Sequence, residues 1–309
     1  MTSRSLRAAP LALAMAALAL GACGSPGTTG DGAGGGAADG RVDGKLAIVA
    51  SFYPLQFATQ QIGGDFVAVT SLTRPGAEPH DVELTPRDVA SVSKARLVVY
   101  QRGLQGAVDH AVESQGGERG LDVSASANLD LTLPSGGTDP HFWLDPQRYS
   151  GVAAVIAERL AVEDPAHRAD YERNAVRFSS RLDTLGQEFT TGLSSCRRKD
   201  IVTSHSAFGY LADRFGMSQI PINGLSPDEE PRAGVLATVS AYARTHGVTT
   251  IYAETLVSPA IAETVARETG ATMATLDPIE GLTEESNGKD YFEVMRANLK
   301  TLRTGQGCT

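Results

Sequence analysis

Short apolar runs alternate with amphipathic helical patterns along most of the chain. The run at 46–50 precedes a helical pattern at 51–61, and a second apolar run follows at 66–72. Apolar runs of this length between helices are typical of buried strands in a parallel sheet. The first half of the chain continues in the same order, with a helix capped by Thr85 and begun by Pro86, a strand at 95–100, a helix at 104–114 and a strand at 129–133.

The alternation returns in the second half of the chain. An apolar run begins at Asp200, and it is followed by strands at 218–222, 248–253 and 271–276 with helices at 207–215, 232–245 and 259–269 between them. The two halves show the same order of strands and helices, which indicates a weak internal duplication. We therefore predict an α/β fold with two parallel-sheet lobes of the (β/α)4 type. Since ligands of such sheets bind beyond the carboxyl ends of the strands, the site is expected in the cleft between the lobes.

One long helical pattern lies between the two halves. Its apolar side chains step by three and four residues along a single face. From Pro165 to about Gly192 such a helix spans ~40 Å, which suits a rigid strut between lobes. A coiled-coil dimer is the competing interpretation, but the pattern is too short for a convincing coiled coil, and we expect a monomer. The face consists of Tyr171, Ala175, Phe178, Leu182, Leu185 and Phe189.

The N-terminal segment has the pattern of a bacterial targeting signal. Arg4 and Arg7 precede an apolar run at 11–20 that is too short for a membrane span. The run ends in Leu20-Gly21-Ala22-Cys23, which resembles the lipobox of bacterial lipoproteins, whose cysteine is lipidated. Ordinary secretion with an incidental Cys23 is the alternative.

The segment after Cys23 is rich in glycine and predicts a flexible tether. It contains a G-x-G-x-x-G match, but no strand precedes that match, so a dinucleotide site is not expected. The net charge of −9 also argues against nucleic acid as a partner. The expected organisation is a signal peptide at 1–22, a tether at 23–44, a first lobe at 45–163, a linking helix at 164–194 and a second lobe at 195–309.

Three of the six histidines, His80, His141 and His205, lie just beyond predicted strand ends in or beside stiff loops. Asp277 occupies a fourth place of this kind. Three imidazoles and one carboxylate complete the coordination shell of a divalent metal, and neutral imidazole suits zinc. Each histidine taken singly is more often structural than a ligand. The coincidence of all four at equivalent places favours a metal site with two ligands from each lobe.

Four motifs carry a family resemblance, and they occur in order along the globular part of the chain. They are Pro79-His80-Asp81, the stretch 139–146, the stretch 204–210 and Leu276-Asp277-Pro278. Together they resemble the metal-binding receptors of zinc and manganese ABC importers, the ZnuA/TroA group. The resemblance implies capture of a metal outside the cytoplasm, delivery to a membrane permease and no catalysis. It also implies His80, His141, His205 and Asp277 as ligands. The lipobox-like sequence separately implies anchoring to the cell membrane through Cys23.

Two departures from the family pattern bear on the metal. The region 113–139 contains no histidine, so a histidine-rich scavenging loop is not expected. Manganese members often have Glu where this chain has His205. A third nitrogen favours a borderline metal over hard manganese, so zinc is the expected cargo and manganese the alternative.

Carboxylates and cysteines near these motifs give further expectations. Glu78 and Asp145 are expected to orient imidazoles, or else to be solvated loop carboxylates. Glu254 faces the predicted cleft, where it either forms a hydrogen bond across the lobes or caps a helix. Cys196 and Cys308 form an even pair in an exported protein and predict a disulfide, with two free thiols as the alternative.

Two other classes of function compete with the receptor. A zinc hydrolase needs an open coordination position for water, and neither H-E-x-x-H nor G-x-S-x-G is present. A surface adhesin is the other rival, although no motif selects for adhesion. We therefore do not expect an enzyme.

Overall fold

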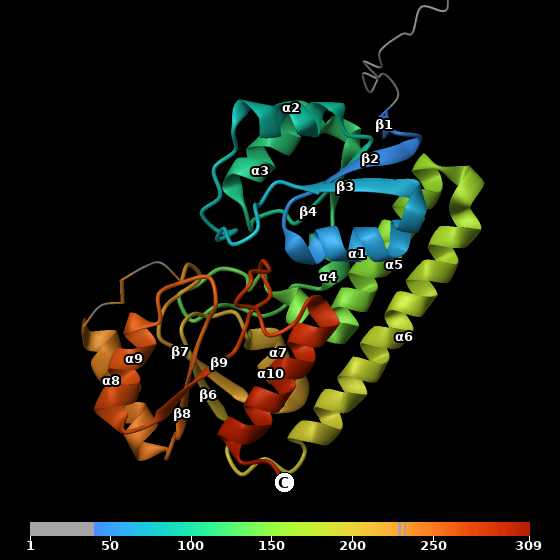
Figure 1. The fold of residues 1–309 in the computed structure, drawn as a ribbon. Coiled ribbons are helices and arrows are strands. Elements are labelled where there is room, and N and C mark those ends of the chain that lie inside the picture. The colour runs from blue at the N-terminus through green and yellow to red at the C-terminus, as the bar shows by residue number, and fades with distance from the viewer. Residues whose placement is uncertain (1–39, 228–229, 232) are drawn as a thin grey trace, which may run out of the picture. The chain divides into compact units, whose positions relative to one another are not determined.

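The computed structural model describes residues 40–227, 230–231 and 233–309. The predicted signal peptide, Cys23 and most of the predicted tether lie outside these residues. In the described part, no helix is both long and apolar enough to cross a bilayer. Two sheets form the framework, with helices packed around each (Figure 1).

The first sheet has five strands. Strand β2 (Lys45–Ala50) pairs in parallel with β3 (Val67–Ser71) and with β4 (Leu97–Tyr100), and β4 pairs in parallel with β5 (Gly120–Asp122). A two-residue strand, β1 (Arg41–Val42), pairs antiparallel with the start of β2. The helices of this half are α1 (Tyr53–Gly63), α2 (Pro86–Lys94), α3 (Gly106–Ala111), α4 (Ser124–Ala127) and α5 (Pro146–Glu163).

The second sheet has four strands in the order β7-β6-β8-β9, and all of its pairs are parallel. The strands are β6 (Asp200–Thr203), β7 (Ser218–Pro221), β8 (Thr250–Ala253) and β9 (Thr272–Thr275). Its helices are α7 (Gly209–Phe215), α8 (Ala233–Thr245), α9 (Ala260–Thr269) and α10 (Tyr291–Gln306). The prediction of an α/β fold with two parallel-sheet lobes is therefore confirmed.

Helix α6 (Arg168–Leu193) runs alongside both lobes (Figure 1). It packs against α1 and α5 on the first-lobe side and against α7 and α10 on the second. Tyr171, Leu182 and Phe189 on its inner face are fully buried. They belong to one hydrophobic cluster that extends from Leu46 of β2 to Leu302 of α10. The predicted linking helix thus forms part of a core that the two lobes share.

Two local predictions in the first lobe were wrong. The fourth parallel strand is β5 at 120–122 and not the segment 129–133. That segment folds back on itself as a hairpin, in which Leu133 N–H donates to Gly137 O at 2.9 Å. Gly136 and Gly137 allow this turn because both have positive φ, at +91° and +85°.

The start of α5 also differs from the prediction. Asp145 caps the helix by accepting a hydrogen bond of 2.9 Å from Gln147 N–H. Pro146 takes the first helical position, which suits its fixed φ. The apolar pattern at 152, 155, 156 and 160 predicts Ser150 as the cap, but Ser150 lies inside the helix and its hydroxyl donates to Ser179 Oγ at 2.8 Å.

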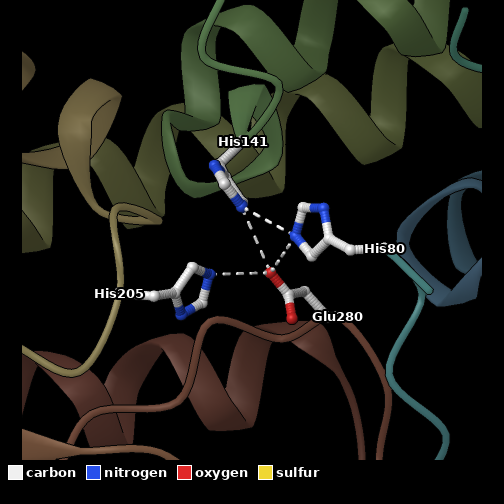
Figure 2. Close-up of side chains that lie close together, drawn as sticks. All are labelled: His80, His141, His205 and Glu280. Carbon is white, nitrogen blue, oxygen red and sulfur yellow. Dashed lines mark hydrogen bonds and ion pairs between the residues drawn. The ribbon is translucent and has the colours of Figure 1, made fainter. Parts of the chain in front are cut away.

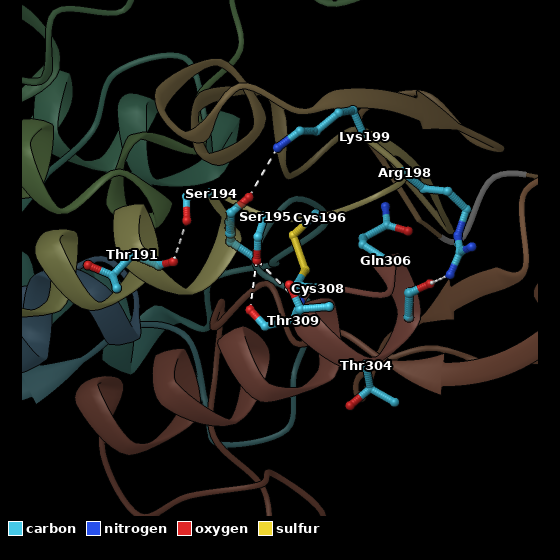
Figure 3. Close-up of a disulfide and its surroundings, with 12 residues drawn as sticks. Thr191, Ser194, Ser195, Cys196, Arg198, Lys199, Thr304, Gln306, Cys308 and Thr309 are labelled. Atoms are coloured by element: carbon cyan, nitrogen blue, oxygen red, sulfur yellow. Dashed lines mark hydrogen bonds between the residues drawn. A yellow bond between two sulfur atoms is a disulfide. The ribbon is translucent and has the colours of Figure 1, made fainter.

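A disulfide joins Cys196 to Cys308 (Figure 3). Cys196 follows α6 and Cys308 follows α10, so the bond connects the ends of the two helices that run beside the second sheet. Ser195 Oγ adds a hydrogen bond of 2.7 Å to the carbonyl oxygen of Thr309. The last residues of the chain are thereby held against the end of α6.

Candidate metal centre

Three imidazoles and one carboxylate converge at a single point (Figure 2). The carboxylate oxygen Oε1 of Glu280 lies 3.3 Å from His80 Nε2, 3.2 Å from His141 Nε2 and 3.3 Å from His205 Nε2. One donor atom from each residue lies within 4.8 Å of all the others. The four side chains are almost completely buried, with at most 3% exposed. Buried donors aimed at one point are the arrangement that a metal ion requires.

The four donors come from both lobes and from loops that follow strands or precede helices. His80 lies in the loop between β3 and α2, and His141 immediately precedes a single 3₁₀ turn that leads into α5. His205 follows β6 by two residues, and Glu280 follows β9 by five. This placement agrees with the rule that sites of parallel α/β sheets form beyond the carboxyl ends of the strands.

Two of the imidazoles are oriented by carboxylates. His141 Nδ1 lies 2.7 Å from Asp139 Oδ1, and the same oxygen accepts the backbone N–H of His141 at 3.0 Å. His205 Nδ1 lies 2.7 Å from Glu254 Oε2, and Glu254 Oε1 accepts the backbone N–H of His205 at 3.1 Å. Since Nδ1 is occupied in both rings, Nε2 is left to face the group. This is the usual way in which proteins orient metal-binding histidines.

His80 is held differently. Glu78 Oε1 accepts its backbone N–H at 3.0 Å, while its ring Nδ1 has no hydrogen-bond partner among the described residues. The orientation of this ring therefore depends on its buried surroundings and on Nε2. Burial, with the charge of Glu280 added, raises the pKa of Glu78 to about 9.

Burial and neighbouring charges shift the pKa values of all four residues in the group. Burial by itself lowers the pKa of a histidine, and the pKa of His80 is lowered. For His141 and His205 the nearby carboxylates outweigh burial, and both pKa values are raised. Burial alone would raise the pKa of Glu280, but the three imidazoles hold it well below its usual range. The carboxylates therefore favour protons on His141 and His205 beside an ionised Glu280, and a divalent cation would compete with those protons.

The comparisons with known proteins agree with this geometry. Residues 48–305 match the family described as ZnuA, zinc-uptake complex component A, periplasmic. The chain belongs to this family. It is 35% identical over 304 residues to the high-affinity zinc uptake system protein ZnuA of Bacillus subtilis strain 168, and the match covers 93% of each chain.

Two solved structures extend the comparison. The Zn(II)-bound ZnuA-like domain of Streptococcus pneumoniae AdcA is 36% identical with a TM-score of 0.74, over 85% of this chain and 99% of that one. The complete zinc-binding lipoprotein AdcA is longer, and this chain spans 56% of its length. The laminin-binding protein Lmb of Streptococcus agalactiae is 34% identical with a TM-score of 0.76, over 84% of this chain and 99% of that one. Lmb is described as a bifunctional protein with adhesin and metal transporting activity.

The structure does not bring Asp277 into the group, although it was the expected fourth ligand. Its Oδ1 accepts the backbone N–H of Ile279 at 2.8 Å, and its backbone N–H is bound by Asn298 Oδ1 at 2.9 Å. The carboxylate thereby closes a turn in which Ile279 has a φ of +59°. Glu280, three residues after Asp277, follows this turn and lies beside the three imidazoles.

Asp145 also lies apart from the imidazoles that it was expected to orient. Its carboxylate caps α5 and pairs with Arg148 at 3.4 Å and Arg214 at 2.9 Å. Asp139 is the carboxylate that binds His141, and the sequence interpretation missed it. A signal for it was present, because Asp139-Pro140-His141 repeats the order acid, proline, histidine of Glu78-Pro79-His80. Glu78 contacts its histidine through the backbone of His80. Glu254 binds the ring of His205, which belongs to the same lobe, so it neither bonds across the lobes nor caps a helix as expected.

Proposed function

We propose that this protein captures one zinc ion outside the cytoplasm, using His80, His141, His205 and Glu280 as ligands, and delivers it to the membrane permease of an ABC importer. The convergence of these four buried donors on one point is the observation that carries the proposal. In this set Glu280 replaces Asp277. The ion is cargo, held until it is passed on.

The donor set supports zinc over manganese. Three imidazole nitrogens with one carboxylate oxygen form a shell that zinc accepts in tetrahedral geometry. Manganese prefers a larger number of oxygen ligands. The zinc-binding relatives described above, in particular the Zn(II)-bound domain, support the same choice.

We further propose that the mature protein is a monomer tethered to the cell membrane through a lipid on Cys23. The lipobox-like order Leu20-Gly21-Ala22-Cys23 and the glycine-rich segment after it support the anchor. A lipidated cysteine with two or three acyl chains gives the multiple attachment that stable anchoring needs. The domain boundaries at 45–163, 164–194 and 195–309 are part of this proposal.

Catalysis is not part of the proposed function. A hydrolytic zinc keeps one coordination position for water, whereas four protein donors fill a tetrahedral shell. Assays of esterase and phosphatase activity on the zinc-loaded protein test this directly, and we expect no turnover above that of the protein without zinc.

Metal analysis and competitive titration test the proposed cargo. The purified protein should contain zinc, and zinc should displace manganese in competition with a chelator of known affinity. His141→Ala and His205→Ala should each lower the zinc affinity sharply, while His110→Ala, a variant of an exposed histidine on α3, should not. Equal zinc affinity in all three variants and the wild type would refute the ligand assignment.

Adhesion is a second candidate function, because the structurally similar Lmb is described as a laminin-binding protein with adhesin activity. A solid-phase assay on immobilised laminin, run with zinc-loaded and with metal-free protein, tests it. Saturable binding would support a second role. Binding no greater than that to an albumin-coated surface would dismiss it.

A further inference from the structure

The first two residues of α7, Gly209 and Tyr210, lie against a hairpin of the other lobe. The Tyr210 hydroxyl donates to the carbonyl oxygen of Asp139 at 3.1 Å and accepts the backbone N–H of Leu131 at 3.3 Å. Leu131 and Asp139 are opposite ends of the hairpin, since Asp139 N–H donates to Leu131 O at 2.9 Å. One buried hydroxyl of the second lobe therefore holds both arms of a first-lobe hairpin.

Gly209 leaves space for the carboxylate at the end of this hairpin. A β-carbon at position 209 would overlap with Asp139 Oδ2, and Leu131 lies close to the same point. The carboxylate has little freedom to turn away. Asp139 is 3% exposed, and its Oδ1 binds both the backbone N–H and the ring Nδ1 of His141. Any side chain at 209 must therefore displace the group that orients His141.

We propose that Gly209 and Tyr210 are positioning residues for His141, acting through Asp139. The inference rests on the proposed zinc function. Gly209 and Tyr210 follow His205 by four and five residues in one short segment. The segment of the second lobe that supplies one ligand thus also fixes the direction of a ligand from the first lobe, and the two halves of the site are assembled together.

Zinc affinity in a double-mutant cycle tests this proposal. Gly209→Ala should bind zinc ~10–100-fold more weakly than the wild type, the range typical for loss of a partner that orients a metal ligand. Asp139→Ala should lower the zinc affinity by a similar factor. It also removes the carboxylate that the β-carbon introduced by Gly209→Ala would overlap with. In the Asp139→Ala background, Gly209→Ala should then cause no further loss. Gly186→Ala is the matched control, because a β-carbon there contacts nothing within 4 Å.

Tyr210→Phe provides a second variant that adds no atoms. Removal of the hydroxyl frees both arms of the hairpin and should weaken zinc binding in the same direction. This variant keeps the proposal testable if Gly209→Ala does not fold. Wild-type affinity in both variants, or an equal loss from Gly209→Ala with and without Asp139, would overturn the proposal.

A measurement on the metal-free protein separates this inference from the proposed function. With ¹⁵N-labelled histidine, the Nδ1–H of His141 bound to Asp139 should give a downfield NMR signal that Gly209→Ala removes and Gly186→Ala retains. Failure of the wild type to bind zinc would refute the function while leaving this signal to report on the geometry. Retention of the signal in Gly209→Ala would refute the inference whatever the wild type binds.

Discussion

The indole nitrogen of Trp143 donates a hydrogen bond of 2.7 Å to the carbonyl oxygen of Pro278. Trp143 follows His141 by two residues, and Pro278 precedes Glu280 by two. This one bond therefore fixes the distance between the loops that carry two proposed ligands from different lobes. The Tyr291 hydroxyl adds a bond of 2.6 Å to the carbonyl oxygen of Trp143, and both aromatic side chains are fully buried.

Trp143→Phe should destabilise the protein and weaken zinc binding. The substitution leaves the Pro278 carbonyl without its donor, which costs ~1–3 kcal/mol for a buried group, and the smaller ring adds a cavity. Urea unfolding of the metal-free variant measures the first effect, and competitive zinc titration measures the second. Tyr291→Phe, which removes the companion bond, should show a smaller change in both. Unchanged stability in Trp143→Phe would mean that the bond does not hold the loops.

Zinc affinity should distinguish Glu280 from Asp277. Glu280→Gln removes a charged donor from the convergent group and should lower the affinity by more than the ~10–100-fold typical of residues that only orient ligands. Asp277→Asn should retain an affinity close to that of the wild type, because Asp277 only accepts the backbone N–H of Ile279 and the amide oxygen of Asn can accept the same bond. The emission of Trp143, the only tryptophan, can follow both titrations. The opposite ranking of the two variants would restore Asp277 as the ligand.

The stability of the metal-free protein should depend on pH through Asp277. Burial raises the pKa of this carboxyl from its usual 3.8 to about 6. The folded state therefore binds this proton more tightly than the unfolded chain. The resulting stability is full below pH ~4 and is lost as the pH rises through ~6, which amounts to roughly 3 kcal/mol.

Asp277→Asn provides the comparison for this effect. Between pH 4 and 7 the wild type should lose roughly 3 kcal/mol of unfolding free energy relative to the variant, since the amide does not titrate. Urea unfolding at several pH values measures the difference. Parallel stability curves for the two proteins would exclude an ionisable Asp277 with a raised pKa.

The disulfide should stabilise the fold without affecting zinc. Cys196 and Cys308 are 112 residues apart in sequence, and the chain-entropy treatment gives ~4–5 kcal/mol for closing a loop of this length. Cys308 follows the C-terminal end of α10, whereas Tyr291 at the other end bonds to Trp143 beside the site, and the 16 residues of the helix span ~24 Å. The double variant Cys196→Ser, Cys308→Ser should therefore unfold at lower urea concentration but titrate with zinc as the wild type does. A changed zinc affinity would show that the bond acts at the site.

The sequence predicted most of the fold because parallel sheets are buried on both faces. Each strand of such a sheet is a short apolar run, and helices separate the runs. The pattern failed at β5, whose three residues Gly120, Leu121 and Asp122 are too few to form a run. The neighbouring segment 129–133 is more apolar, but the glycines at 136 and 137 turn it into a hairpin.

The candidate site was predicted in part. The three histidines were identified because each follows a predicted strand in a stiff loop. Glu280 was not, since it reaches the group through a turn in which Ile279 has a φ of +59°. A β-branched residue such as Ile279 rarely adopts a positive φ, and the local sequence contains no pattern that predicts this turn. The predicted strand end located the loop that contains Asp277 and Glu280. It did not show which of these two carboxylates faces the imidazoles.

Helix α6 and the core around it limit the ways in which cargo can enter and leave. A single hydrophobic core extends from the first lobe through α6 to α10. Rotating the lobes apart as rigid bodies would expose this core to water, which costs free energy. We therefore expect the ion to exchange through small rearrangements of the loops around His80 and Glu280, not through rigid-body opening of the lobes. On this expectation, the residence time of the bound ion is set by the rate at which these loops rearrange.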